Sequence, residues 1–111
     1  MPRSALERIR KICLVLPETE ETITWGEPHF RVRGKIFCGH GNEKGKEVIG
    51  LKLEMEHADI LVQNDPRFTR APYVGHKGWV SLDAKAIDDW NEVRALVQES
   101  YRLISSKRKQ R

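Results

Sequence analysis

The residues best suited to chemistry lie in the segment APYVGHKGWVSLD, residues 71–83, which surrounds the pair His76-Lys77. A histidine can transfer a proton near neutral pH, and a neighbouring lysine can hold an anion. The same histidine can instead lock a turn through a hydrogen bond. One proline and two glycines restrict and shape the backbone here. We therefore interpret the segment as a rigid platform that presents Lys77, with His76 as its latch.

Established catalytic motifs are absent from the chain. It has no P-loop, dinucleotide-binding fingerprint, HExxH, GxSxG or CxxC motif. The glycine-rich stretch GHGNEKGKE, residues 39–47, lacks the GK[ST] ending and the strand–loop–helix setting of a phosphate cradle, so it predicts a hairpin turn. The four histidines show no metal-ligand spacing, and Cys13 and Cys38 stand among apolar neighbours as expected for buried thiols. We expect no catalytic residue, no metal site and no cofactor.

Basic residues gather in the middle of the chain. The net charge of +4 equals the four cations of the ending KRKQR, so the remaining body is neutral overall. Residues 17–27 carry four acids and no base, whereas the predicted hairpins and the 71–83 segment carry the cations. Clustered cations suit an anionic partner, although strand faces that are simply solvated show the same pattern. The candidate nucleic-acid contacts are Arg31, Arg33, Lys35, Lys44, Lys46, Arg70, His76 and Lys77.

The hydrophobic periodicity predicts an α+β domain with an antiparallel meander. Ser4 and Glu7 form a capping box that begins a helix over residues 4–15. The segment PETEET is expected to be a polar connector, and alternating residues between 23 and 54 predict three or four antiparallel strands. A short helix at 55–63, a long irregular link, a last strand at GWVSLD and a helix at 87–105 follow. The helices are expected to cover one side of the sheet.

The length of 111 residues fits one domain, which we place at residues 1–106, followed by a basic, disordered tail at 107–111. No apolar run is long enough to span a membrane, and charged residues interrupt the N-terminal segment. We therefore expect a cytoplasmic protein without membrane contact, and a monomer is favoured.

Three blocks of sequence carry a family resemblance. They are LPETEETITWGEPHFRVRGKIF, DPRFTRAPYVGHKGWVSLD and ESYRLI, and together they cover nearly the whole chain. The sequence resembles the MmcQ/YjbR family. This resemblance implies a frataxin-like α+β domain that is often compared with a "double-wing" DNA-binding domain, and the family is labelled DNA-binding largely by analogy of fold. It implies no catalytic residues.

Three functions follow as hypotheses. The first is a DNA-binding protein whose basic hairpin wings contact the phosphate backbone without strict sequence preference. The second is a non-enzymatic adaptor that binds a protein or small ligand on a concave, aromatic-lined sheet face formed by Trp25, Tyr73 and Trp79, with His76 beside them. The third is an enzyme that uses His76 as a general base.

Overall fold

The computed structural model describes residues 4–72 and 75–106; the tail expected at 107–111 lies outside the described residues. Its elements are α1 (Ala5–Leu14), β1 (Thr19–Thr24), β2 (Glu27–Val32), β3 (Lys35–Glu43), β4 (Lys46–Lys52), α2 (Met55–Asn64), β5 (Phe68–Arg70), η1 (Gly75–Lys77), β6 (Trp79–Asp83), η2 (Ala84–Ala86) and α3 (Trp90–Ser106). The six strands form one antiparallel sheet in the order β1-β2-β3-β4-β6-β5. The α+β prediction is confirmed.

Three two-residue turns build the meander. Trp25-Gly26, Arg33-Gly34 and Lys44-Gly45 each join neighbouring antiparallel strands, and both residues of each turn have positive φ. Two positive φ angles define the type I′ turn, whose twist matches that of the paired strands. Glycine occupies the second position each time because it adopts this conformation without steric cost. The hairpins are therefore encoded locally.

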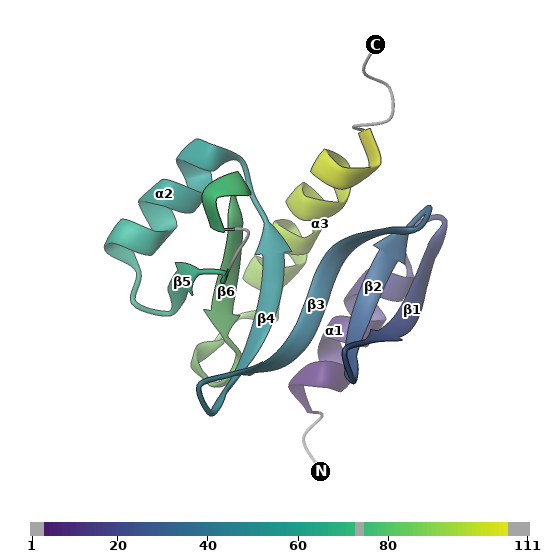
Figure 1. Cartoon of the computed structure of the whole chain (residues 1–111), viewed down its shortest axis with the longest axis horizontal. Coiled ribbons are helices and arrows are strands. Elements are labelled where there is room, and N and C mark those ends of the chain that lie inside the picture. The colour runs from purple at the N-terminus through teal and green to yellow at the C-terminus, as the bar shows by residue number, and fades with distance from the viewer. Residues whose placement is uncertain (1–3, 73–74, 107–111) are drawn as a thin grey trace.

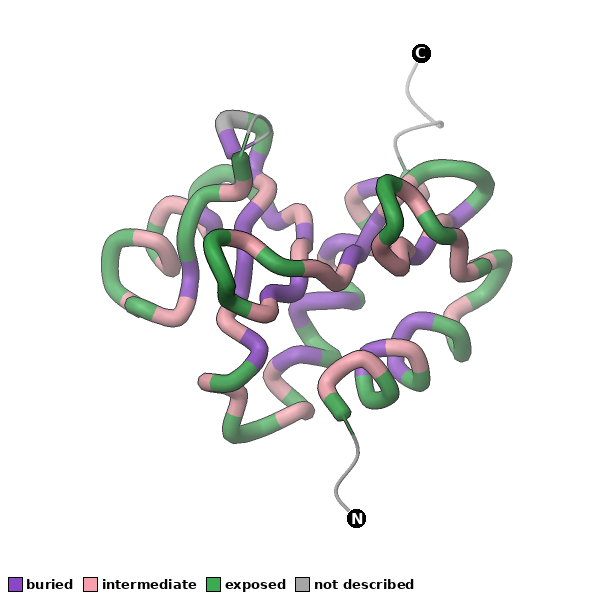
Figure 2. The backbone as a smooth tube through the Cα atoms, turned by 60° about the horizontal axis from the view of Figure 1, so that its bottom comes forward, coloured by how far each residue is buried: buried purple, intermediate pink, exposed green. Residues whose placement is uncertain are grey.

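Helices α1 and α3 lie behind the sheet, and α2 lies beside β5 and β6 at one edge (Figure 1). Helix α1 begins at the predicted capping box, in which Ser4 Oγ accepts from the Glu7 backbone N–H at 3.1 Å. The core combines Phe30, Phe37 and Leu51 from the strands with Ile9 and Val97 from the helices. Buried residues lie along the strands and helices toward the centre of the molecule, whereas the turns are exposed (Figure 2).

The Ser100 hydroxyl of α3 is inserted where β3 and β4 diverge. Its Oγ accepts from the Lys52 backbone N–H at 2.9 Å and donates to the Phe37 carbonyl at 2.6 Å. The last direct pair between the two strands is Cys38 with Leu51. Ser100 therefore substitutes for the next rung of the ladder, and the two halves of the sheet spread apart beyond it, as Figure 1 shows.

The structure differs from the sequence-based expectation in two segments. The acidic connector is largely strand: β1 begins at Thr19 and pairs with β2 along its whole length. The irregular link contains β5, which pairs with β6 through Phe68 and Leu82. Both are sheet edges, where pairing with one neighbour outweighs weak local propensity. No helix within residues 4–72 and 75–106 is long and apolar enough to cross a membrane.

Candidate functional site

The face of the sheet opposite α1 and α3 has a glycine floor at its centre. Gly39 of β3 pairs directly with Gly50 of β4, and Gly41 follows two residues along β3 on the same face. Because successive side chains of a strand alternate between faces, these three positions leave the middle of this open face without side chains. The result is a groove between the two halves of the sheet.

The three glycines differ in whether their surroundings require the absence of a side chain. A Cβ atom on Gly39 would lie 2.9 Å from Cδ2 of His29, and one on Gly41 would overlap the Glu27 carboxylate. These two glycines make room for neighbouring side chains. A Cβ atom on Gly50 would meet nothing within 4 Å, and its φ lies outside the left-handed region. Neither packing nor backbone conformation of the described residues therefore requires a glycine at position 50.

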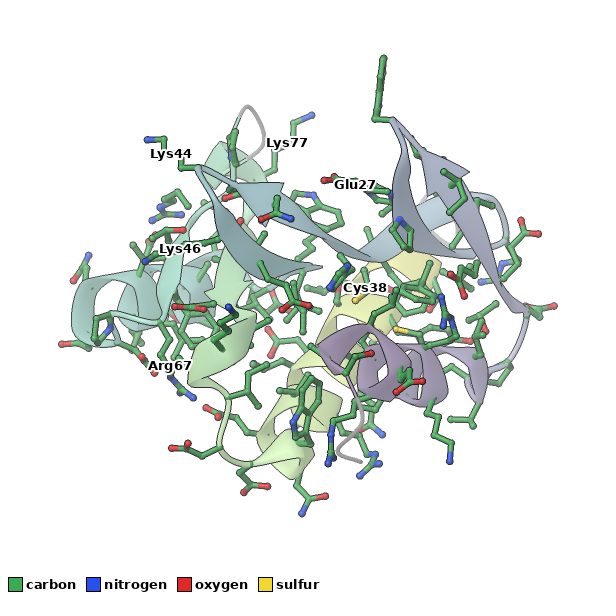
Figure 3. All side chains as sticks on the ribbon, turned by 90° about the horizontal axis from the view of Figure 1, so that it is seen from below. Glu27, Cys38, Lys44, Lys46, Arg67 and Lys77 are labelled. Atoms are coloured by element: carbon green, nitrogen blue, oxygen red, sulfur yellow. The ribbon has the colours of Figure 1, made fainter. Side chains whose placement is uncertain are left out.

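Strand β2 supplies one wall of the groove. The His29 ring lies over Gly39, and its Nδ1 is 3.0 Å from the Glu27 backbone carbonyl. Because a carbonyl only accepts, Nδ1 carries the proton of this hydrogen bond, which leaves Nε2 of the neutral ring as an acceptor. The Glu27 carboxylate accepts from the Asn42 backbone N–H at 3.1 Å. Figure 3 shows Glu27 on this wall.

The opposite wall and one end are apolar. Ile36 and the half-buried Trp79 border a hollow of about 310 Å³ together with His29, Gly39 and Gly50. A second hollow of about 110 Å³ shares the last three residues and extends to Glu27 and Glu43. The shared lining joins the two hollows into one groove with an apolar end and an acidic end. Its main hollow is at the small end of the range for ligand sites.

The acidic end is rich in hydrogen-bond acceptors. Glu43 Oε2 accepts from Ser81 Oγ at 2.8 Å, and Glu27 stands across the floor. Neither carboxylate has a cation within ion-pair distance among the described residues. Two carboxylates and the His29 ring therefore offer acceptors to a ligand that carries N–H or O–H groups.

The predicted arginine contacts are engaged within the protein. Arg31 donates to Thr22, Thr24 and the Gly34 carbonyl. Arg33 pairs with Glu18 and donates to the Ser105 carbonyl at 2.9 Å. Arg70 pairs with Asp59 and donates to the Gly75 carbonyl at 3.2 Å. These guanidinium groups hold hairpins and helices together.

The predicted lysine contacts are exposed but divided between two ends of the sheet. Lys35 follows the β2–β3 turn, whereas Lys44 is the first residue of the β3–β4 turn, and Lys46 follows this turn at the other end of β3. Nine residues of strand separate these turns by about 30 Å. Lys77 is also exposed, and Figure 3 shows it with Lys44 on the open side of the sheet.

The predicted aromatic face is divided as well. Trp79 lines the groove, whereas Trp25 stands at the β1–β2 turn with 92% of its surface exposed. Tyr73 and the side chain of His76 lie outside the described residues. Gly78, in the same segment, has φ +93°, and a Cβ there would collide with the Leu53 carbonyl, so this turn does require glycine.

Sequence reasoning missed the floor and the β2 wall of the groove. The available signal was a glycine inside each of two strand patterns, at positions 39 and 50. Their pairing across neighbouring strands depends on register, which a single sequence does not display. His29 and His40 lie on adjacent strands, but alternation places them on opposite faces, and His40 Nε2 is 2.6 Å from the Glu47 carboxylate.

The two cysteines are buried free thiols, as predicted. Burial, reinforced by a hydrogen bond with Cys38, raises the pKa of Cys13 far above its ordinary value. A protonated, enclosed thiol is a poor nucleophile. Among the described residues, no group of three histidine, cysteine or acidic side chains could hold a metal ion.

The fold and groove describe a small α+β protein with an open antiparallel sheet and helices behind it. The YjbR family model matches residues 14–103, and the chain belongs to this family. The chain is similar to the Deinococcus radiodurans protein DR2400, of a domain family designated DUF419, with 20% identity, a TM-score of 0.81 and coverage of 92% of this chain and 79% of that one.

A second solved structure, a Bacillus subtilis protein of the duf1801 family, is similar with 13% identity and a TM-score of 0.54, over 90% of this chain and 75% of that one. At these identities both structures support the fold alone. No curated protein matches the chain significantly.

Proposed function

We propose that this protein is a binding module whose ligand site is the glycine-floored groove on the open sheet face. The main support for the proposal is that Gly50 is a glycine inside a strand although no neighbouring atom requires it. An interior strand glycine costs roughly 0.5–1 kcal/mol relative to alanine. Such a glycine often marks a place where a ligand approaches the backbone closely. No neighbour within 4 Å accounts for it here.

The lining defines the class of ligand. Trp79 and Ile36 suit an aromatic or aliphatic group, and Glu27, Glu43 and His29 suit hydrogen-bond donors or a positive charge. The proposed ligand is therefore a small amphipathic amine or an exposed basic side chain of another protein. The adaptor hypothesis from the sequence agrees with this groove better than the DNA hypothesis does, because two carboxylates repel phosphate at close range.

The groove is tested with a matched pair of probes, phenethylamine and phenylacetate, which share an aromatic ring and carry opposite charges. We expect the amine to shift the amide signals of Gly39 and Gly50 and the indole signal of Trp79 in NMR spectra at about millimolar concentration. Phenylacetate is expected to leave them unchanged. Equal shifts with both probes, or shifts confined to other surfaces, would contradict the proposal.

Variants at position 50 separate binding from folding. Gly50→Leu fills the hollow, so we expect the amine-induced shifts to disappear. Thr69→Leu is the matched control, because it adds a similar side chain to β5, a strand that contributes no lining residue to either hollow. If Gly50→Leu remained folded and bound the amine unchanged, the groove would not be the site.

A second candidate function is contact with the DNA backbone through Lys44, Lys46 and Lys77. Their exposure favours this function, since exposed lysines on one side of a sheet can reach phosphates. The triple Lys→Glu variant should abolish binding to a fluorescent duplex at about 50 mM salt, and wild-type affinity should fall steeply as salt rises. Binding that survives the triple variant would remove these hairpins from the DNA hypothesis.

A further inference from the structure

The outer surface of α1 carries a stripe that the fold leaves uncovered. Arg8, Lys11 and Val15 recur at intervals of three and four residues, so they lie on one face of the helix and its C-terminal cap. All three are exposed, and Val15 keeps 79% of its surface in solvent. Leu14 beside them is 41% exposed. Large apolar side chains next to cations are thus presented at the end of a helix whose other face is buried.

Helix α3 extends this stripe into a groove. Arg94 of α3 borders a hollow of about 520 Å³ with Lys11, Ile12, Leu14 and Val15. A smaller hollow of about 110 Å³ shares Lys11, Ile12 and Arg94 and continues to Arg8 and Trp90. The two hollows therefore form one groove that follows α1 along its contact with α3.

Three of the four cations that line this groove lack acidic partners among the described residues. The Arg8 guanidinium stands 5.6 Å from the centre of the Trp90 ring, and Arg94 donates to the neutral Asn91 side chain at 3.0 Å. No carboxylate of the described residues lies within ion-pair distance of Arg8, Lys11 or Arg94. The fourth cation, Arg10, is paired with Glu21 at 2.7 Å. Three positive charges thus surround an apolar floor.

We propose that the groove between α1 and α3 is a docking surface for an acidic amphipathic helix of a partner protein. Leucine-type side chains on one face of that helix would pack on Ile12, Leu14 and Val15, and flanking carboxylates would pair with Lys11 and Arg94. Ten residues make α1 about 15 Å long, which accommodates two to three turns of a partner helix. This surface lies behind the sheet, and its occupant is independent of the ligand in the open-face groove.

Charge and shape select this occupant among the alternatives. The chain's own ending KRKQR is basic, so it is repelled by Arg8, Lys11 and Arg94. Nucleic acid offers phosphates for the cations, but bases stack on aromatic rings rather than on the aliphatic floor, and Arg8 already lies over the ring of Trp90. An acidic helix satisfies both the apolar floor and the cations at once.

The test uses a fluorescein-labelled synthetic peptide with leucines on one face of a helix and glutamates on the other. A matched peptide with lysines in place of the glutamates is the first control. We expect saturable binding of the acidic peptide alone, with NMR shifts at Lys11, Leu14, Val15 and Arg94. The double variant Lys11→Glu/Arg94→Glu should weaken binding about tenfold or more, whereas Lys44→Glu on the other side of the molecule should not.

Val15→Asn provides a test of the apolar floor that leaves the charge unchanged, and it is expected to weaken binding with little change in melting temperature, since the side chain is exposed. Thermal unfolding of every variant shows that each is folded. Equal binding of the lysine peptide would overturn the proposal. An equal loss of peptide binding in Lys44→Glu would also overturn it. A third contrary outcome is that a duplex oligonucleotide or phosphatidylserine vesicles shift the NMR signals of these residues while the acidic peptide does not.

Discussion

At the scale of single residues, Ser100 shows how one hydroxyl shapes the sheet. It is fully buried and connects the Phe37 carbonyl to the Lys52 backbone N–H across the point where two strands part. No buried side-chain polar atom of the described residues lacks a hydrogen-bond partner. The opening of the sheet therefore does not leave these backbone groups unsatisfied.

Ser100→Ala removes both hydrogen bonds from a closed interior. Because unsatisfied buried groups cost about 1–3 kcal/mol, we expect the free energy of unfolding to fall by about 2 kcal/mol or more. Urea unfolding measures this change, and Ser106→Ala, which is exposed on the same helix, should change it by less than about 0.5 kcal/mol. Equal effects of the two substitutions would show that Ser100 does not serve as the bridge.

At the scale of elements, glycine has two distinct roles in the meander. Gly45 completes the β3–β4 turn with φ +83°, and no side chain stands near it. Gly50 lies in β4 with an ordinary φ and equally open surroundings. Gly45 is exposed in a left-handed turn and Gly50 is half-buried in a strand, but an added Cβ meets no neighbour within 4 Å at either position. The same substitution therefore compares the two backbone conformations.

Gly45→Ala should lower the free energy of unfolding by about 1 kcal/mol, because alanine is strained in the left-handed region. Gly50→Ala should leave it unchanged or raise it by up to about 1 kcal/mol, because alanine has less conformational entropy to lose on folding. Chemical denaturation of both variants measures the difference in sign. A destabilised Gly50→Ala would show that the fold itself needs this glycine, and would remove the main support for the groove.

At the scale of the whole molecule, the pH dependence of stability follows from carboxyl groups that titrate below neutral pH and from a thiol that titrates above it. Hydrogen bonds from Arg10 lower the pKa of Glu21, and those from Arg67 lower the pKa of Asp65. Folding therefore gains stability above the ordinary carboxyl range and loses it as the pH falls through it. Cys13 acts in the opposite direction, because its pKa is raised by burial. The stability that Cys13 contributes as a neutral thiol is fully present below the ordinary thiol pKa, and it is lost as the pH rises above that value.

We therefore expect a plateau of stability between about pH 5 and 8, with a decline on either side. Above about pH 8.5 the unfolded Cys13 ionises while the folded thiol does not, which costs up to about 1.4 kcal/mol per pH unit. Urea unfolding between about pH 7 and 9.5 measures the slope. Cys13→Ala should flatten it, and an unchanged slope would assign it to other groups.

The sequence by itself determined the local structure of this protein. The capping box of α1, the β3–β4 hairpin turn and the burial of the cysteines were predicted from residues close together in the chain. The hydrophobic periodicity predicted the fold class, which the family resemblance also implied. The edge strands β1 and β5 were missed, since their pairing overrides weak local signals.

Only the tertiary structure decided the surfaces. It joined Gly39 to Gly50 by strand register, engaged Arg33 and Arg70 with distant partners, and brought Arg94 beside Lys11. The role of a charged residue or a glycine cannot be assigned from the sequence alone. It depends on residues distant in the chain that only folding brings within a few ångströms.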